Sequence, residues 1–240
     1  MAGKNRDSHW IPLADLMTAL MVIFLFIAVA YMEEVQKEKE QQDQIINNYQ
    51  KDKLILYNEL KEAFKKDFKR WDLRLDNDLS IKFINPQVLF GTGSSDITPQ
   101  FQAILIEFIP KYLNVVLQEK YVGKIAEIRI EGHTDTQPVF INGDPYIDNM
   151  KLSQDRCRNV MAFLRSQSCF NDLKPSIKDR LQYWLTANGL SYGRTVDLEY
   201  KTTYDTKKAI DNNKSRRVEF RIVTTSEEVI KQALKNIEKK

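Results

Sequence analysis

The sequence has few of the residues on which most metal sites and many enzymes depend. Among 240 residues there are two histidines and two cysteines, and no cysteine or aspartate stands at zinc-site spacing around either histidine. No nucleophile–base pair is evident, so we expect neither an enzyme nor a cofactor. The net charge is only +3, with basic and acidic residues interleaved, which argues against nucleic-acid binding.

The two cysteines, Cys157 and Cys169, are expected to be separated by most of a helix. A helix rises 1.5 Å per residue, which would place their Cα atoms roughly 15 Å apart. A disulfide allows only about 7 Å. The spacing therefore favours Cys157 as a small core residue over a disulfide.

One apolar run stands out near the N-terminus. Residues 10–31 read WIPLADLMTALMVIFLFIAVAY, and about 20 apolar residues are enough to cross a bilayer. The run exceeds the apolar region of a cleaved signal peptide, and Glu33 and Glu34 follow where small residues would be needed for cleavage. We therefore expect a retained transmembrane helix over residues 10–31.

Charge predicts the orientation of this helix. Residues 1–9 carry Lys4 and Arg6 against Asp7, whereas acidic residues outnumber basic ones over residues 33–40. The positive-inside rule then makes residues 1–9 a cytoplasmic leader and places the rest of the chain outside the membrane. In a bacterium this is a single-pass inner-membrane protein with a periplasmic C-terminal domain.

Residues 32–78 are expected to form a charged helical stalk, since residues 33–75 contain no glycine or proline. Tyr49, Leu56 and Ala63 are seven residues apart, which suits a short dimeric coiled coil. A helix that packs on the following domain explains the same pattern equally well.

Residues 79–225 have the pattern of an α+β domain, a mixed-sheet α/β sandwich with helices on one face. Thr98 and Pro99 are expected to begin a long helix as N-cap and first residue. Strands are predicted over residues 79–84, 88–90, 124–131, 181–187 and 216–224, and helices over 99–121 and 153–167. Residues 226–240 are expected to form a C-terminal helix or tail.

Three motifs in this domain carry chemistry. Residues 130–135 read IEGHTD at a strand end, residues 149–156 read NMKLSQDR at a helix start, and residues 215–222 read SRRVEFRI in the last strand. In this order they resemble the OmpA-like peptidoglycan-binding domain, whose motifs are Gly-His-Thr-Asp, Asn-x-x-Leu-Ser-x-x-Arg and Asn-Arg-Arg-Val. The resemblance covers residues 80–224 and implies peptidoglycan as a partner.

A diaminopimelate side chain in the wall peptide carries one ammonium and one carboxylate. Asp135 is expected to bind the ammonium, and Arg156 the carboxylate as a bidentate fork. The first amides of a helix that begins near Ser153 would add positive charge. The resemblance also places Asn149 in the pocket and Arg217 beside it.

Several alternatives stand beside this assignment. In an alternative without ligand binding, Asp135 and Arg156 form a plain salt bridge with each other. Arg216 then only braces the sheet. His133 is expected to be buried and to fix the turn through a hydrogen bond. Asp144 and Asp148 suit a calcium loop or, more simply, a solvated loop. The chain departs from the family pattern in three places, which leaves the fine ligand preference open: Ser215, Gly93 and a charged insertion at 197–214.

The membrane segment suggests more than an anchor. Residues 14–21, ADLMTALM, resemble the membrane segment of MotB-type stator subunits, in which an acid near the cytoplasmic end carries the ion. Asp15 and Thr18 share one helix face. The resemblance implies that an ion, taken as a proton, binds Asp15 and drives rotation of a surrounding MotA/ZorA-like subunit ring. The ring would turn about a homodimer that the wall holds still. Alternatively, Asp15 only opposes the helix dipole.

The layout narrows the resemblance further. With nine residues before Trp10 and a charged stalk, the chain resembles the ZorB family of Zorya anti-phage defence systems. Flagellar MotB, the alternative, typically has a longer leader and a plug segment. A passive membrane-to-wall tether without ion conduction is the second alternative.

Overall fold

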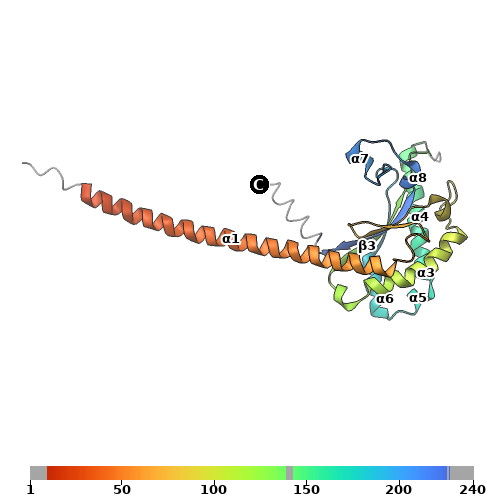
Figure 1. The fold of residues 1–240 in the computed structure, drawn as a ribbon, viewed down its shortest axis with the longest axis horizontal. Coiled ribbons are helices and arrows are strands. Elements are labelled where there is room, and N and C mark those ends of the chain that lie inside the picture. Colours follow the sequence, from red (N-terminus) through yellow and green to blue (C-terminus); the bar gives the residue numbers. More distant parts are fainter. Residues whose placement is uncertain (1–9, 139–142, 226, 228–240) are drawn as a thin grey trace, which may run out of the picture. The chain divides into compact units, whose positions relative to one another are not determined.

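The computed structural model describes residues 10–138, 143–225 and 227 (Figure 1). It divides into two compact units, Met1–Gln50 and Lys51–Lys240. The first unit consists, in its described part, of the N-terminal portion of helix α1 (Trp10–Ala63). Large apolar side chains such as Leu16 and Phe26 are 66% and 69% exposed there. In the described chain, α1 alone is long and apolar enough to cross a membrane, judged by length and composition.

The predicted stalk over residues 32–78 is too long, because the chain enters the second unit at Lys51. Leu56, Leu60 and Phe64 are at most 2% exposed and belong to the domain core. Their spacing of four residues places them on one helix face. For this part of the helix, the alternative of packing on the following domain is correct. The coiled coil stays a prediction.

Polar contacts hold the same end of α1. Tyr121 Oη donates a hydrogen bond to Glu59 Oε2 at 2.8 Å, and Lys124 Nζ lies 2.8 Å from Asp52 Oδ1. Lys120 also pairs with Glu59. Apolar burial and ion pairs therefore fix the C-terminal turns of α1 to the domain.

The domain contains one mixed five-stranded sheet in the order β1-β2-β5-β3-β4. Strands β3 and β4 are parallel, and the other neighbours are antiparallel. This confirms the predicted α+β class. The strands are β1 (Leu73–Leu75), β2 (Ser80–Phe83), β3 (Ile125–His133), β4 (Leu185–Gly189) and β5 (Arg217–Thr224).

The helices include the predicted long one, α3, whose N-cap Thr98 accepts a hydrogen bond from the backbone N–H of Phe101. Thr98 and Pro99 thus begin the helix as predicted. The elements are α2 (Pro86–Leu89), α3 (Pro99–Val116), the 3₁₀ turn η1 (Glu119–Tyr121), α4 (Pro145–Ser166), α5 (Ser168–Asn171), α6 (Pro175–Trp184), α7 (Thr203–Thr206) and α8 (Asn212–Ser215).

Several predicted boundaries are wrong. The helix predicted over 99–121 ends at Val116, and the 3₁₀ turn η1 follows it. Residues 88–90 are not a strand, because Pro86 begins the helical turn α2 and only Phe90 forms an isolated bridge. Residues 181–184 end helix α6, so β4 begins at Leu185. Helix α4 begins at Pro145, eight residues before the predicted start at Ser153, because Asp144 caps it. The predicted C-terminal helix lies outside the described residues except for residue 227.

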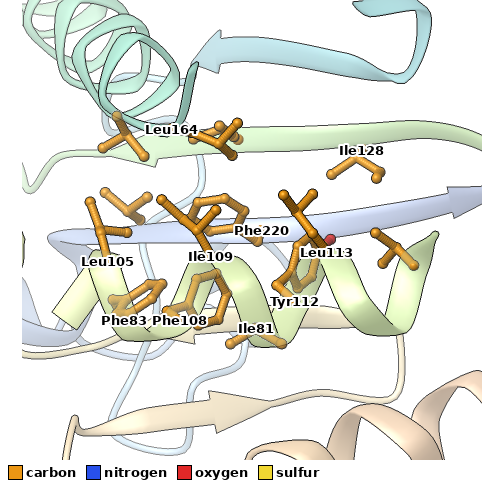
Figure 2. Packing of buried hydrophobic residues seen from close by; sticks show 14 of the residues in the cluster. Ile81, Phe83, Leu105, Phe108, Ile109, Tyr112, Leu113, Ile128, Leu164 and Phe220 are labelled. Atoms are coloured by element: carbon orange, nitrogen blue, oxygen red, sulfur yellow. The ribbon is translucent and has the colours of Figure 1, made fainter. Parts of the chain in front are cut away.

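The core lies between the sheet and helix α3. Figure 2 shows Phe108 and Tyr112 of α3 against Phe220 of β5, with ring centroids 5.0 and 5.6 Å apart. Alternation along β5 places Val218, Phe220 and Ile222 on this face. Arg217, Glu219 and Arg221 therefore point to the opposite face.

Candidate functional site

A cavity of about 590 Å³ opens where the ends of several elements meet. Helix α2 and the following turn form one wall, the end of β3 and the start of α4 form another, and the start of β5 completes it. Its charged and polar lining includes His133, Thr134, Asp135, Gln137, Asn149, Arg156, Arg216 and Arg217. The structure thus gathers all four residues that the sequence predicts for wall binding around a single cavity.

Asp135 lies two residues after the end of β3 and is only 4% exposed. Its Oδ1 accepts a hydrogen bond from the backbone N–H of Gln137 at 3.1 Å, and its Oδ2 lies 2.9 Å from Arg216 Nη1. Asp135 and Arg156, both described, form no ion pair within 4.0 Å, so the alternative of a plain salt bridge between them is wrong. Arg216 does more than brace the sheet, because it pairs with the acid in the cavity.

Arg156 lies in the fourth turn of α4 and is 8% exposed. Its Nε donates a hydrogen bond to the carbonyl oxygen of Ser94 at 2.9 Å, and its guanidinium lies 4.9 Å from the ring centre of Phe90. Burial lowers the pKa of Arg156 to about 10; Asp135 raises this pKa, and the Arg216 charge lowers it further. The guanidinium therefore remains charged at neutral pH and holds the 91–95 turn.

The predicted contribution of helix amides near Ser153 is wrong. Ser153 lies inside α4, where its Oγ donates to the carbonyl oxygen of Met150 and accepts from the backbone N–H of Ser191. The true N-terminus of α4 is capped by Asp144, whose Oδ1 accepts from the N–H of Tyr146 at 2.9 Å. Asp148 is fully buried. The expected solvated loop over Asp144 and Asp148 is therefore a capped helix start instead.

Asn149 is 1% exposed and connects the start of α4 to the loop after β3, within one wall of the cavity. Its Nδ2 donates to the carbonyl oxygens of Gln137 at 3.1 Å and Pro145 at 3.0 Å. Both amide hydrogens are thus used within the protein. The geometry favours Asn149 as a residue that positions the loop after Asp135.

Arg217 is 5% exposed and turns away from Asp135. Its Nε donates to Glu219 Oε1 at 2.6 Å, and its Nη1 donates to the carbonyl oxygens of Arg194 and Ser215. Most of its hydrogen-bonding capacity is therefore used beneath the cavity. The neighbouring Arg216 is the more exposed cation at the site.

Beneath the cavity, charged residues are buried on the sheet face opposite the core. Lys82, Glu131 and Glu219 are each at most 8% exposed. The segment that follows β4 covers them: Arg194 Nη1 lies 3.7 Å from Glu131 Oε2. In Figure 1, α7 of this segment lies across the sheet from α3 and α6.

His133 is buried among these charges. Its Nε2 lies 3.3 Å from Glu219 Oε1 and 3.8 Å from Glu131 Oε2, yet neither ring nitrogen makes a hydrogen bond in the described chain. The predicted burial is correct, but the predicted hydrogen bond is wrong. Burial, together with the positive charges of Arg217, Lys82 and Arg194, holds the pKa of His133 well below its usual range. The imidazole is neutral at physiological pH.

Within the described residues, Glu131, His133 and Glu219 form the one group that could hold a metal ion, with ligand atoms within 4.8 Å of one another. Charge argues against this use. Arg217 and Lys82 already lie 2.6 and 3.6 Å from Glu219 Oε1, and a divalent ion would face both cations. The group fits a balanced ion network better.

The sequence interpretation missed two residues of the cavity. The sequence predicts for Arg216 only a role in bracing the sheet and for Thr134 no role, although the buried Oγ1 of Thr134 makes no hydrogen bond within the described chain. Both lie inside the motifs at 130–135 and 215–222, so the motifs themselves were the available signal.

In the membrane segment, Asp15 and Thr18 lie on exposed turns of α1. Thr18 Oγ1 donates to the carbonyl oxygens of Ala14 at 3.1 Å and Asp15 at 2.9 Å. These bonds satisfy the Thr18 hydroxyl within the helix, so that it needs no partner from an apolar environment. The Asp15 carboxylate is exposed at the helix surface.

Comparison with known proteins gives one extensive sequence match. The chain is 37% identical over 237 residues to the Zorya protein ZorB of Escherichia coli (strain Crooks), covering 96% of this chain and 94% of the relative. No family model matches the chain.

Solved structures give weaker likenesses. A putative MotB-like protein from Desulfovibrio vulgaris is 19% identical with a TM-score of 0.47, covering 73% of this chain and 93% of that chain. The cell wall anchor of the T6SS from Pseudomonas aeruginosa is 19% identical with a TM-score of 0.44, covering 69% and 96%.

Proposed function

Because the chain belongs to the ZorB family of Zorya proteins, we propose that it is a stator-like subunit that anchors an inner-membrane motor to the cell wall. The apolar part of α1 crosses the membrane with residues 1–9 in the cytoplasm, and the domain after it lies in the periplasm. The observation that carries this proposal is that one chain combines an acid in an apolar helix with a cavity that holds separate positive and negative groups.

The cavity would bind peptidoglycan through the diaminopimelate of a stem peptide. Asp135 and Arg156 line the same cavity and do not pair with each other, while Asp135 pairs with Arg216. Asn149 positions the loop that carries Asp135, and Arg217 supports the cavity floor. A ligand held by buried side chains on a strand end and a helix is held rigidly, as an anchor requires.

The membrane helix would carry the ion. An ionised carboxylate costs up to roughly 2.5–3.5 kcal/mol at the centre of a membrane helix on insertion scales. Asp15 lies nearer the cytoplasmic end, where the cost is smaller, and a function that uses its charge explains an acid within the apolar run. Asp15 binds and releases a proton at the boundary with a ring of MotA/ZorA-like subunits. Thr18, one turn away, lines the same face. Two copies of this chain, held by the wall, form the axis about which the ring turns.

The first test is phage plating on cells that carry the gene with its native neighbours. We expect Asp15→Asn and Arg156→Ala each to abolish protection, because one removes the ion carrier and the other the wall contact. Arg158→Ala, on an exposed turn of the same helix, is the control and should protect like wild type. Immunoblots of the membrane fraction check that each variant is present.

Protection that survives Asp15→Asn but not Arg156→Ala would indicate a passive tether and overturn the ion path. If the wild-type gene gives no protection against a varied phage panel, a swimming assay in a strain without its own stator tests the flagellar alternative. Co-sedimentation with purified sacculi tests the wall contact directly, and Arg156→Ala should reduce the bound fraction while Arg158→Ala does not.

A further inference from the structure

The acid expected to bind an ammonium is already occupied in this structure. Asp135 Oδ2 lies 2.9 Å from Arg216 Nη1, and Asp135 Oδ1 accepts the N–H of Gln137. Arg216 is itself held in place, because its Nη2 donates to Asn213 Oδ1 at 2.5 Å. An incoming ammonium would therefore have to share Asp135 with a fixed guanidinium.

The charges that line the cavity leave a positive excess. Arg217 is matched by Glu219 at 2.6 Å, and Asp135 is matched by Arg216. Arg156 is left without a carboxylate partner within 4.0 Å among the described residues, and its Nε and Nη2 bind only carbonyl oxygens. Among the described residues, the guanidinium of Arg156 is thus the one in the cavity lining that forms no ion pair with a carboxylate.

A neutral donor adds to this excess. Thr134 is 2% exposed, lines the cavity and has a hydroxyl without a hydrogen-bond partner in the described chain. A buried hydroxyl left unpaired costs free energy, and a ligand oxygen would satisfy it. Arg156, Arg216 and Thr134 thus each bring hydrogen-bond donors to the cavity lining, which suits a ligand with an anionic oxygen.

We propose that Arg216 sets the specificity of the cavity, so that the free carboxylate of the ligand, rather than its ammonium, is the group that decides binding. This inference rests on the proposed wall-binding function and names the form of diaminopimelate that is bound. The cavity accepts diaminopimelate with a free side-chain carboxylate whether its amine is free or acylated, as it is in cross-linked wall. It rejects diaminopimelate whose carboxylate is amidated.

The size of the effect follows from the groups involved. An amide in place of the carboxylate removes a charge-assisted hydrogen bond to Arg156 and turns an N–H toward a guanidinium. Losing such a bond weakens binding by roughly ten-fold or more. Acylation of the amine removes only the contact of the ammonium with Asp135, which Arg216 already weakens. We therefore expect the affinity to change by less than about three-fold.

The experiment uses the full chain in detergent micelles and isothermal titration with three forms of the tripeptide alanyl-γ-glutamyl-diaminopimelate. One is unmodified, one is amidated at the diaminopimelate side-chain carboxylate, and one is acetylated at the diaminopimelate side-chain amine. For wild type, we expect similar affinities for the unmodified and acetylated forms, and binding at least ten-fold weaker for the amidated form. This series does not depend on how any variant folds.

Arg216 is then tested by substitution. Arg216→Gln frees Asp135, so this variant should bind the unmodified tripeptide at least ten-fold more tightly than the acetylated form. Arg216→Lys keeps the charge and should retain the wild-type pattern. Arg158→Gln removes an exposed arginine of α4 and should also leave the pattern unchanged. Thermal unfolding checks that each variant is folded.

Two results would overturn the inference while leaving wall binding intact. One is a ten-fold loss for the acetylated form in wild type, which would make the ammonium decisive. The other is an Arg216→Gln variant that is folded and keeps the wild-type preference. If none of the three tripeptides binds wild type, the wall-binding proposal itself fails, and this inference fails with it.

Discussion

Replacing Gly189 by alanine should disturb the domain and its cavity together. Gly132 of β3 and Gly189 of β4 are register partners in the parallel pair, and both face helix α4. A Cβ atom at Gly189 would lie 2.3 Å from the backbone nitrogen of Gln154 and 2.7 Å from its Cα. These atoms belong to the helix backbone, so no side-chain rotation can relieve the clash.

The cost can be estimated from the shift that is required. Ordinary carbon contacts begin near 3.5 Å, so α4 must move by about 1 Å. Overpacking of this kind costs roughly 1–3 kcal/mol. The move also disturbs the 2.6 Å bond from the N–H of Gly189 to Gln154 Oε1. Because α4 carries Arg156, its 2.9 Å bond to the carbonyl of Ser94 would lengthen beyond a useful hydrogen bond.

Urea unfolding followed by circular dichroism measures the first effect, and sacculus co-sedimentation measures the second. We expect Gly189→Ala to lower the free energy of unfolding by roughly 1–3 kcal/mol and to bind less sacculus material. Gly91→Ala is the control for stability, since its added Cβ would meet only Ser94 Cβ at 3.6 Å. An unfolding midpoint equal to wild type for Gly189→Ala would refute the close-packing argument.

Three further predictions concern other parts of the domain. Leu60→Ala should lower the free energy of unfolding by roughly 2–5 kcal/mol. Ile46→Ala, on an exposed turn of α1, should change this free energy by no more than about 0.5 kcal/mol. Equal urea midpoints for the two variants would place Leu60 outside the core. Burial raises the pKa of Asp76, but hydrogen bonds from Arg74 and Lys82 outweigh it and hold this pKa below its usual value of 3.8. The ionised form therefore stabilises the fold above the unfolded-state pKa, and this contribution is lost as pH falls through the lower folded-state pKa. Asp76→Asn should thus be less stable than wild type at neutral pH, with a difference that shrinks below about pH 4. A stability difference that stays constant with pH would contradict this. Burial raises the pKa of the Cys157 thiol to about 12, and both cysteines are free, so maleimide should label Cys169 in the folded protein and Cys157 only after unfolding in urea. Equal labelling rates for the two thiols before unfolding would contradict the burial of Cys157.

The order of the main elements could be predicted because their signals are local. Thr98 and Pro99 specify a capped helix start, and the alternation along 124–131 specifies a strand. The same logic was available at Asp144 and Pro145, an N-cap followed by proline at the first helical position. Glycine and proline close together also predict a loop there, and this competing signal misplaces the start of α4 in the sequence interpretation.

The boundary of the domain could not be predicted in the same way. Leu56, Leu60 and Phe64 form a stripe that must be buried, but the period of a stripe does not reveal which surface buries it. A second copy of the helix and the sheet of the same chain give the same pattern. Only the fold shows that α3 and the sheet supply the contact.

At the site, the motifs predicted which segments meet but not which arginine faces the cavity. Along a strand, adjacent side chains point to opposite faces, so a shift of one residue exchanges them. Arg216 precedes β5 and reaches Asp135, whereas Arg217 begins β5 and reaches Glu219. The residue at which β5 begins therefore decides which of the two arginines faces the cavity. Helix α8, which ends just before β5, sets that residue.

The way in which α1 ends has a mechanical consequence. Its C-terminal turns lie in the core, so tension along this helix acts on the folded domain rather than on a slack tether. To pull these turns away, Leu56 and Leu60 must be hydrated, and Asp52 and Glu59 must give up their ion pairs. Resistance to force is thus tied to the free energy of unfolding. A variant with a weakened core would yield under load even when every residue of its cavity is intact.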